Sequence, residues 1–306
     1  KDTKKRCYKK IIFDPSTKHH SNNCYNIFNG FQADSYYNDI ENEEVIDRFL
    51  THLSNLCSGD QEASKFLLNY ICHLFQLPEI LPEVTVVICG MKGCGKDLLI
   101  DYIENLIGSE YITRTQNFNT LFGEFNSAIK NKLVIQINEV SGKDGYRMKE
   151  EIKEFITKKK LNINEKNMKP YSLNNFSRTF MMSNNNNPIE ITQDNRRFFV
   201  INCDKIQDED YYSNLYEDMN NKNSLRILYE FLKNHSLDGF KVKKPPVTKK
   251  MMTMTEHNLD PIYYFLEQYL YDSVKFIKDD DELSGNDGEQ AEQGEEKALE
   301  EITFIT

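Results

Sequence analysis

Residues 84–97 constrain the fold more than any other part of the chain. The run VTVVICG (84–90) is continuously apolar and rich in β-branched residues, which is typical of a strand buried on both faces of a parallel sheet. A glycine-rich turn follows, and LLIDYIENLIG then predicts a helix that ends at Gly108. Strand, glycine turn and helix in direct succession indicate a sheet whose strands alternate with helices.

The rest of the chain extends this pattern. Apolar runs predict three more strands at 133–138, 178–184 and 196–203, and helical periodicity marks 120–130, 147–157, 211–220 and 225–234. These segments predict an α/β domain over residues 83–240 with a largely parallel sheet. Two amphipathic helices before it form a small helical module at 40–82. Residues 241–278 are expected to be a linker, or a solvated basic strand, followed by a short C-terminal helical segment from 257 to 274.

Composition separates the ends of the chain from its body. The 306 residues are 39% hydrophobic and 28% charged, which excludes a mostly disordered chain. Residues 1–39 begin as a basic arm and continue as a linker segment, and residues 279–306 form an acidic tail that is expected to be disordered. The stretch 279–301 carries eleven acids and one Lys, so it accounts for the whole net charge of −10. The acidic balance therefore does not exclude a nucleic-acid partner for the body.

Cellular location and covalent chemistry follow from simple absences in the sequence. No apolar run approaches the roughly 20 residues of a membrane helix, and no secretory signal follows the basic start. The chain opens on Lys1, which indicates a fragment or a processed piece. Seven cysteines at irregular spacing predict reduced, buried thiols in an intracellular protein, without zinc. His19 and His20 lack a third ligand at metal spacing, so no metal site is expected there.

The glycine-rich turn matches G-x-x-x-x-G-K between a buried strand and a helix, the context in which this motif binds phosphate. Its glycines let successive N–H groups point inward, and the helix adds its positive N-terminal end. Lys96 is expected to reach the β- and γ-phosphates of ATP. The nucleotide-binding residues expected from this motif are Gly90, Met91, Lys92, Gly93, Cys94, Gly95, Lys96 and Asp97.

Asp97 departs from the motif, which normally has Ser or Thr after the lysine to bind Mg²⁺. A carboxylate is a good ligand for a hard cation, but it also adds negative charge beside the phosphates. Asp97 therefore either binds Mg²⁺ directly or impairs nucleotide binding, and the sequence leaves both readings open.

Three later segments supply further candidates. Glu139 ends the run LVIQINEV and is expected to serve Mg²⁺ and the attacking water, although a strand that ends in Glu is common. Asn184 ends TFMMSN and could contact the γ-phosphate or orient the water, or it could simply begin an Asn-rich turn. Arg196 and Arg197 enter the next strand and point to opposite faces. One of them could be an arginine finger for a neighbouring subunit, or both could be surface arginines.

Four elements in this order, GMKGCGKD, QINEV, TFMMSNN and DNRRFF, resemble the superfamily 3 helicases. The resemblance is strongest to the poxvirus-type primase–helicase branch of large DNA viruses, virophages and some phages, and it covers roughly residues 25–270. It implies an AAA+-like ATPase that forms a ring, usually a homo-hexamer, and moves along single-stranded DNA. By motif position it implies phosphate contact by Lys96, Mg²⁺ and water for Glu139, a sensor role for Asn184 and a finger role for Arg196 or Arg197. Primase and other replication proteins would be partners, at a viral replication site or in the host cytoplasm, with no membrane.

A lysine-rich segment is the candidate for DNA contact. Residues 143–169 hold nine Lys or Arg against five acids, and LNI and YSL predict the strands of a β-hairpin with residues 165–169 near its tip. The resemblance implies that such a hairpin lines the pore of the ring. Lys166 and Lys169 are the expected DNA-binding residues, or they belong to an ordinary solvated surface.

Three functions remain open from the sequence. The first is an ATP-dependent DNA helicase, in which the P-loop is the ATP-binding site. The second is a P-loop ATPase that does not unwind DNA, such as an initiator or a packaging motor. The third is a nucleotide-binding scaffold that has lost catalysis, which Asp97 suggests.

Overall fold

The computed structural model describes residues 8–16, 23–37, 42–138, 142–192, 194–257 and 269, without the side chains of 142–148 and 257. The chain divides into two compact units, residues 1–255 and 256–306, and nearly all of the second lies outside the described residues. The first unit is a mixed α/β fold built on a five-stranded parallel sheet. Within the described part, no helix is long and apolar enough to cross a membrane.

The sheet has the spatial order β4-β5-β8-β3-β9, and every neighbouring pair is parallel. Val87 of the interior strand β3 lies opposite Met181 of β8 and Val200 of β9. The strands are β3 (Thr85–Gly90), β4 (Ile112–Thr115), β5 (Val134–Ile137), β8 (Arg178–Ser183) and β9 (Phe198–Cys203). The predicted largely parallel sheet is confirmed.

Both faces of the sheet are buried, because successive side chains alternate between two cores. Val86 and Ile88 belong to one core, and Val87 and Cys89 belong to the other. All four are fully buried. This explains why the sequence of β3 is a continuous apolar run rather than an alternating one.

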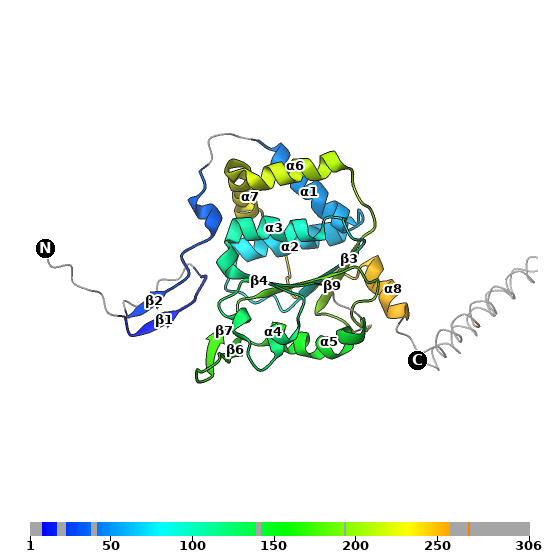
Figure 1. Ribbon diagram of the computed structural model, residues 1–306. Helices are drawn as coiled ribbons and strands as arrows, with labels where there is room; N and C mark the ends of the chain where they lie inside the picture. The colour runs from blue at the N-terminus through cyan, green and yellow to red at the C-terminus, as the bar shows by residue number, and fades with distance from the viewer. Residues whose placement is uncertain are drawn as a thin grey trace, which may run out of the picture. The chain divides into compact units, whose positions relative to one another are not determined.

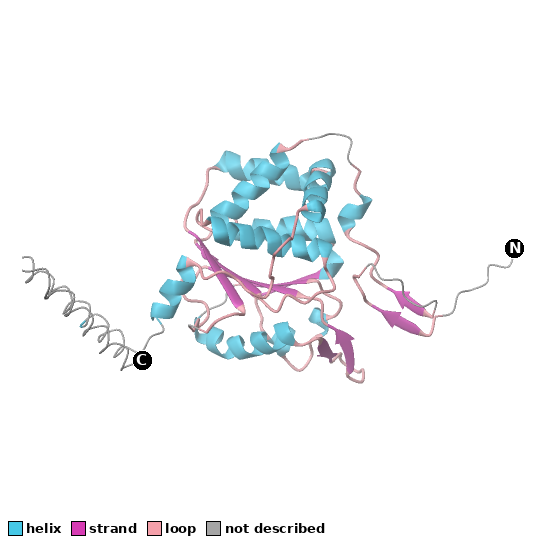
Figure 2. Ribbon diagram, turned by 180° about the vertical axis from the view of Figure 1, so that it is seen from behind, coloured by secondary structure: helices cyan, strands magenta, loops and turns pink. Residues whose placement is uncertain are grey.

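Helices cover each face of the sheet (Figure 1). One layer carries most of the helices, and the other contains α5 and the short α4, as the reverse view in Figure 2 also shows. The first layer consists of α1 (Glu44–Leu56), α2 (Gln61–Gln76), α3 (Lys96–Ile107), α6 (Glu209–Asn220) and α7 (Lys222–Asn234). The second contains α4 (Asn119–Phe122) and α5 (Gly142–Thr157), and Met251 and Met254 of α8 (Lys249–His257) pack into its core. The fold is therefore a three-layer α/β/α arrangement.

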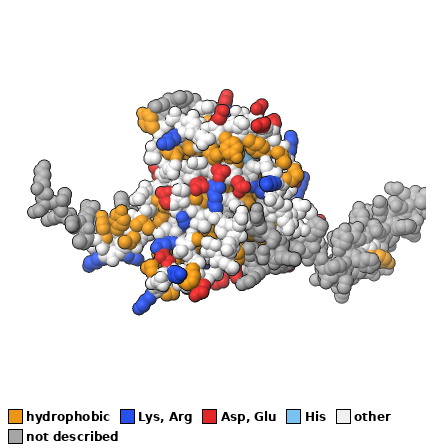
Figure 3. Space-filling model, in the orientation of Figure 1, with side chains coloured by type: hydrophobic (Ala, Val, Ile, Leu, Met, Phe, Trp, Pro, Cys, Tyr) orange, Lys and Arg blue, Asp and Glu red, His pale blue; other side chains and the backbone are white. Residues whose placement is uncertain are grey.

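Smaller elements complete the unit. A parallel pair is formed by β1 (Lys10–Ile12) and β2 (Cys24–Asn26), and an antiparallel hairpin by β6 (Lys160–Ile163) and β7 (Tyr171–Asn174). The short 3-10 helices are Gln32–Ser35, Ser109–Tyr111 and Ser127–Ile129. Hydrophobic side chains gather on the surface of the β1–β2 pair (Figure 3), where Tyr8, Ile11 and Tyr25 are exposed.

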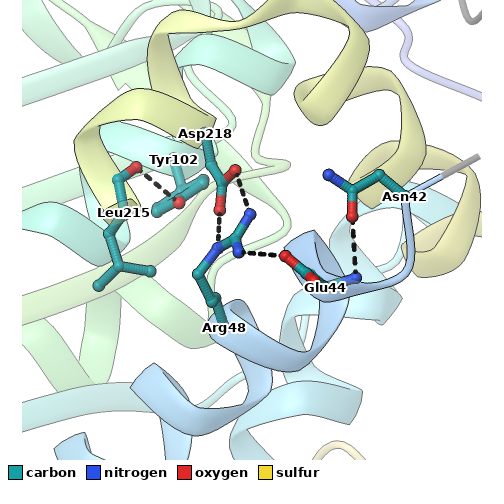
Figure 4. A network of polar contacts seen from close by, with 6 residues as sticks. All are labelled: Asn42, Glu44, Arg48, Tyr102, Leu215 and Asp218. Atoms are coloured by element: carbon teal, nitrogen blue, oxygen red, sulfur yellow. Dashed lines mark hydrogen bonds and ion pairs between the residues drawn. The ribbon is translucent and has the colours of Figure 1, made fainter. Parts of the chain in front are cut away.

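The buried carboxylate of Asp218 connects helix α6 to helix α1 (Figure 4). Arg48 of α1 donates two hydrogen bonds to Asp218 of α6, at 2.7 and 2.8 Å, and a third to Glu44 at 3.1 Å. Nearby, the Tyr102 hydroxyl of α3 donates to the Leu215 carbonyl of α6 at 2.8 Å. A two-pronged arginine–carboxylate pair fixes geometry as well as charge, so it sets how α6 lies against α1.

Arg178, the first residue of β8, is a fully buried cation without a carboxylate partner in hydrogen-bond contact among the described residues. Its guanidinium donates to His73 Nδ1 at 2.9 Å. It also donates to backbone carbonyls at or just after the end of α2 and next to β8, namely those of His73, Leu77, Pro78, Ile80 and Phe176. The carbonyl end of a helix carries partial negative charge, so α2 supplies the compensation that a carboxylate would otherwise give.

Most predicted elements are confirmed, with three differences. The helix predicted at 120–130 is wrong, because α4 ends at Phe122 and only a short turn, Ser127–Ile129, follows. Strand β4 was not predicted; its short sequence ITRT has only one buried residue. Helix α8 begins at Lys249, inside the predicted linker, and the helix expected at 257–274 falls almost wholly outside the described residues.

Candidate functional site

The loop after β3, residues 90–97, lies at the carboxyl end of the sheet and is here called the glycine loop. Gly93 and Gly95 both have φ of +88°, a conformation that residues with a Cβ rarely adopt. A Cβ on Gly90 would lie 2.6 Å from the Cys203 carbonyl oxygen of β9, because these two residues are register partners. The glycines are therefore required by backbone conformation and by close packing against the neighbouring strand.

The side chain of Lys96 is folded into the glycine loop. Its ammonium donates to the carbonyls of Gly90 and Met91, both at 2.8 Å, and to Asn184 Oδ1 at 3.0 Å. Only 7% of the residue is exposed. An ammonium has three N–H donors, so these three oxygens satisfy it and hold its charge at the mouth of the loop.

A polar bridge links the start of α3 to the end of β5. Gln136 Nε2 donates to Asp97 Oδ1 at 2.7 Å and to Asn138 Oδ1 at 2.8 Å. Gln136 is fully buried, and its Oε1 has no hydrogen-bond partner among the described residues. One buried amide therefore fixes two oxygen-bearing side chains beside the glycine loop.

The glycine loop borders a cleft of about 580 Å³. Its wall includes Lys96 and Asp97 of α3, Asn138 after β5, Asn184 after β8, and Tyr216 of α6. Ligands in open parallel sheets bind outside the carboxyl ends of the strands, where the strand order changes direction. Strand β3 is such a place, because the chain goes from β3 toward β4 on one side and later returns to β9 on the other.

His52 contacts the backbone of the glycine loop. His52 of α1 lies with Nε2 3.1 Å from the Gly95 carbonyl and Nδ1 2.9 Å from the Tyr211 hydroxyl. Asn55 donates to that same hydroxyl at 3.1 Å, so the hydroxyl donates to Nδ1 and Nε2–H donates to Gly95. Burial lowers the pKa of His52 to about 4, against a weaker raising effect of the Gly95 carbonyl. His52 is therefore neutral at pH 7.

The pKa of the Cys94 thiol in the glycine loop is also shifted. The pKa of Cys94 is lowered, first by contact with the Cys203 thiol and also by the nearby ammonium of Lys96, while burial acts against both. The same contact raises the pKa of Cys203. Negative charge on Cys94 is stabilised by the cation that holds the loop.

We expect acid to destabilise this protein through its buried histidines. Burial, and then the charge of Arg178, lower the pKa of His73 to about 3, and the pKa of His52 is also low. Between these values and the unfolded pKa of about 6.5, the unfolded chain binds more protons, so stability falls as pH falls. Each histidine should remove about 2 kcal/mol between pH 7 and pH 5. Guanidinium denaturation at both pH values measures this, and His52→Gln should reduce the difference; an unchanged difference would contradict the neutral, buried state of His52.

The structure places some of the other predicted site residues here. Asn184 directly follows β8, the neighbour of β3, and contacts Lys96 as described. Strand β5, which Asn138 follows, does not lie beside β3, because β8 lies between the two strands. Glu139, the predicted catalytic acid, lies outside the described residues.

The predicted finger arginines lie at the opposite end of the sheet. Arg197 precedes β9, and its carbonyl accepts a hydrogen bond from the amide of Thr85 at the start of β3, at 2.7 Å. Arg196 and Arg197 line a separate cavity of about 330 Å³ with Lys149 and Lys153 of α5. They do not line the cleft beside the glycine loop of their own chain.

The predicted lysine-rich hairpin is present as β6 and β7. Lys166 and Lys169 are exposed in the connection between the two strands, and Figure 3 shows basic side chains around this hairpin. Glu165 is held at the base of the connection by Lys130 at 2.8 Å and by the Tyr171 hydroxyl at 2.5 Å. Those contacts lower the pKa of Glu165, so this acid is engaged with its own partners and not with the two lysines.

Sequence reasoning missed the residues that support the site. Gln136 and Asn138 stand inside and just after an apolar run, where only the alternation of the strand could have shown that Gln136 breaks it. His52 belongs to an amphipathic helix 43 residues before Gly95, and no local pattern connects the two. Tyr216 faces the cleft from α6 and carries no motif.

The fold and this geometry define a class: a parallel α/β domain with a lysine-bearing glycine loop at the carboxyl end of an interior strand. A family model described as "Family of unknown function (DUF5906)" matches residues 88–197, from β3 to the start of β9. The chain is similar to the DNA primase-polymerase of Nitratiruptor phage NrS-1, with 28% identity over 209 residues, which is 67% of this chain and 29% of that protein. The chain thus matches less than a third of the length of this relative.

Solved structures of the C-terminal region of NrS-1 share the fold. Two apo structures cover 94% of this chain and 71% of theirs, with TM-scores of 0.71 and 0.70 at 24% and 22% sequence identity. At this identity the likeness establishes the fold and carries no activity with it.

These relatives correct one expectation from the sequence. The interpretation of this chain as a helicase with an ATP-binding P-loop is contradicted, since the similar phage protein is named a DNA primase-polymerase. The short motifs that suggested a helicase are a loop and three strand ends, features shared by many parallel α/β domains. What the comparisons support is a relationship to a phage DNA replication protein.

Proposed function

We propose that the cleft binds the triphosphate of a nucleotide together with Mg²⁺ and hydrolyses it, as one module of a phage-type DNA replication protein. The observation that supports this most is the Lys96 ammonium, enclosed by Gly90, Met91 and Asn184 at the mouth of a loop with required glycines. A buried cation in a glycine-rich loop at a helix N-terminus favours a polyphosphate over a neutral ligand.

Each group has a proposed role in this chemistry. The glycine loop and Lys96 bind phosphate oxygens, and Asn184 exchanges its bond with Lys96 for one with the terminal phosphate or the attacking water. Asp97 and Asn138 offer the oxygen ligands that Mg²⁺ prefers. When bound, Mg²⁺ would neutralise charge on the phosphate oxygens. Glu139 follows Asn138 directly in sequence and is proposed to orient the attacking water.

The wider setting of the module is also a proposal. The name of the NrS-1 relative supports a role in DNA replication, with single-stranded DNA and other replication proteins as partners, inside a host cell. Assembly as a homo-hexamer remains a proposal from the sequence, with Arg196 or Arg197 acting on the nucleotide of a neighbouring subunit. That arrangement is compatible with their distance from the cleft of their own chain.

Equilibrium binding tests the proposed function directly. The chain is titrated with fluorescent ATP, GTP and dTTP analogues with and without Mg²⁺, and phosphate release is then measured with the unlabelled nucleotides. Binding together with release supports an enzyme. Binding without release supports the inactive scaffold, and absence of binding for every nucleotide would exclude the proposal.

The hairpin gives a separate prediction about DNA. Replacing Lys166 and Lys169 with Ala should weaken binding of single-stranded DNA and lower the slope of log K against log[salt] by about 0.7 for each lost phosphate contact. Fluorescence anisotropy over a salt series measures both effects. The matched control is Lys241→Ala with Lys244→Ala, two exposed lysines of the segment before α8. A loss in the control and none in the hairpin variant would move the DNA site to that segment.

A further inference from the structure

The cleft contains two sequence positions that hold Mg²⁺ in many nucleotide-hydrolysing proteins, and the negative charge is placed differently on them here. Where a glycine loop of this type hydrolyses a nucleotide, Mg²⁺ is held by a Ser or Thr after the lysine and by an Asp at the end of a strand. Here the residue after Lys96 is Asp97, and the residue that directly follows the strand β5 is Asn138. The carboxylate and the neutral oxygen have exchanged places, and the formal charge of the pair is still −1.

The geometry shows that the two positions act on the same space. Asp97 Oδ1 and Asn138 Oδ1 both accept from Gln136 Nε2, at 2.7 and 2.8 Å, although they come from different elements. Asp97 and Asn138 both line the cleft that contains Lys96. A carboxylate has about four acceptor sites and a side-chain amide oxygen has two, so each can keep its bond to Gln136 and still bind a cation.

The side chain that orients both oxygens is itself unusual. The Gln136 side chain is fully buried, and its Oε1 has no hydrogen-bond partner among the described residues. Burying a polar oxygen without a partner is costly. The amide nitrogen is committed to orienting Asp97 and Asn138, which explains why a polar side chain is retained in an otherwise apolar strand.

We infer that Asp97 and Asn138 form an exchanged Mg²⁺ pair, in which Asp97 supplies the carboxylate that a strand-end Asp supplies elsewhere and Asn138 supplies the neutral oxygen. This inference rests on the proposed nucleotide site. It resolves the two readings that Asp97 allows: the carboxylate does not add charge beside the phosphates, because Asn138 removes the charge that the strand end would contribute. Since Mg²⁺ usually keeps several waters, the two oxygens act on it directly or through such a water.

A double-mutant cycle tests the exchange. Asp97→Ser should weaken cation binding at least about tenfold, because it removes the charged ligand. Asn138→Asp places two carboxylates at one site and should weaken nucleotide binding about tenfold in the absence of a divalent cation. The double variant, Asp97→Ser with Asn138→Asp, restores the common arrangement and should return both affinities to within about threefold of the parent chain. Strong non-additivity of this kind is the signature of two side chains that share one partner.

The readout is Mn²⁺ binding, measured from the electron paramagnetic resonance signal of free Mn²⁺ with a non-hydrolysable triphosphate analogue present. Thermal unfolding confirms that each variant is folded. If the double variant binds Mn²⁺ no better than Asp97→Ser, the exchanged pair is wrong. If the parent chain binds neither the analogue nor Mn²⁺, the proposed function itself fails, so the two failures are distinguishable.

Discussion

Replacing Lys96 with Ala should reduce nucleotide affinity by about 30- to 150-fold and abolish hydrolysis. Truncating a buried charge that contacts an opposite charge costs about 2–5 kcal/mol, and a cost of about 2–3 kcal/mol corresponds to this loss of affinity. The ammonium is also the group that joins the Gly90 and Met91 carbonyls to Asn184, so its removal loosens the mouth of the loop. Titration with a fluorescent nucleotide and a phosphate-release assay measure the two effects.

Lys65→Ala is the matched control for this experiment. Lys65 is an exposed lysine of α2 and does not line the cleft. The control should bind and hydrolyse nucleotide as the parent chain does. Unchanged affinity in Lys96→Ala would remove the glycine loop from consideration as the phosphate site, because no other group in the loop carries a buried positive charge.

Replacing Arg178 with Met should lower the free energy of unfolding by about 3–5 kcal/mol. Methionine fills much of the volume but donates nothing, so the carbonyls at the end of α2 lose their donor, and each buried unsatisfied group costs about 1–3 kcal/mol. Burial lowers the pKa of Arg178 to about 10, so the residue is still charged at pH 7. Equilibrium unfolding in guanidinium chloride gives the value.

Arg114→Met serves as the comparison. Arg114 forms two ion pairs, with Asp101 and Glu104, but its side chain is 31% exposed, and ion pairs of this kind contribute at most about 1 kcal/mol. The ratio of the two losses should therefore be at least about three. Equal losses would mean that the carbonyls around Arg178 find water once the guanidinium is removed.

Most of the sheet could be predicted from the sequence, because strands buried on both faces consist of apolar residues. Strands β3, β5, β8 and β9 are apolar runs, and each was predicted within about two residues. Among the described strands, β4 lies at the edge of the sheet and pairs with β5 alone. Its single buried side chain gives no recognisable pattern in the sequence. The order of the strands could not be read from the sequence, since the position of β8 between β5 and β3 depends on crossovers and not on local residues.

The candidate site was predictable only where its chemistry is local. The glycine loop is contiguous, so spacing alone identified Gly90, Gly95 and Lys96. Gln136 contributes through a contact with Asp97, and His52 through a contact with Gly95. Both contacts join residues far apart in the sequence, so no sequence periodicity predicts them. The acid at Glu139 was assigned from sequence order and stays a prediction. The helicase interpretation failed because four short motifs constrain a fold more tightly than they constrain what the whole protein does.

The placement of β3 has a consequence for synthesis of the chain. Thr85 pairs with Thr179 and Phe198, so both neighbours of the most apolar strand are made long after it. At roughly 5–20 residues per second, β3 leaves the ribosome on the order of 10 s before either neighbour exists. Helices α1 and α2 precede it and share one hydrophobic core with Val86 and Ile88 in the finished fold. An early helical pair can thus shield one face of a nascent strand during that interval, whereas the other face is covered only after later segments have been made.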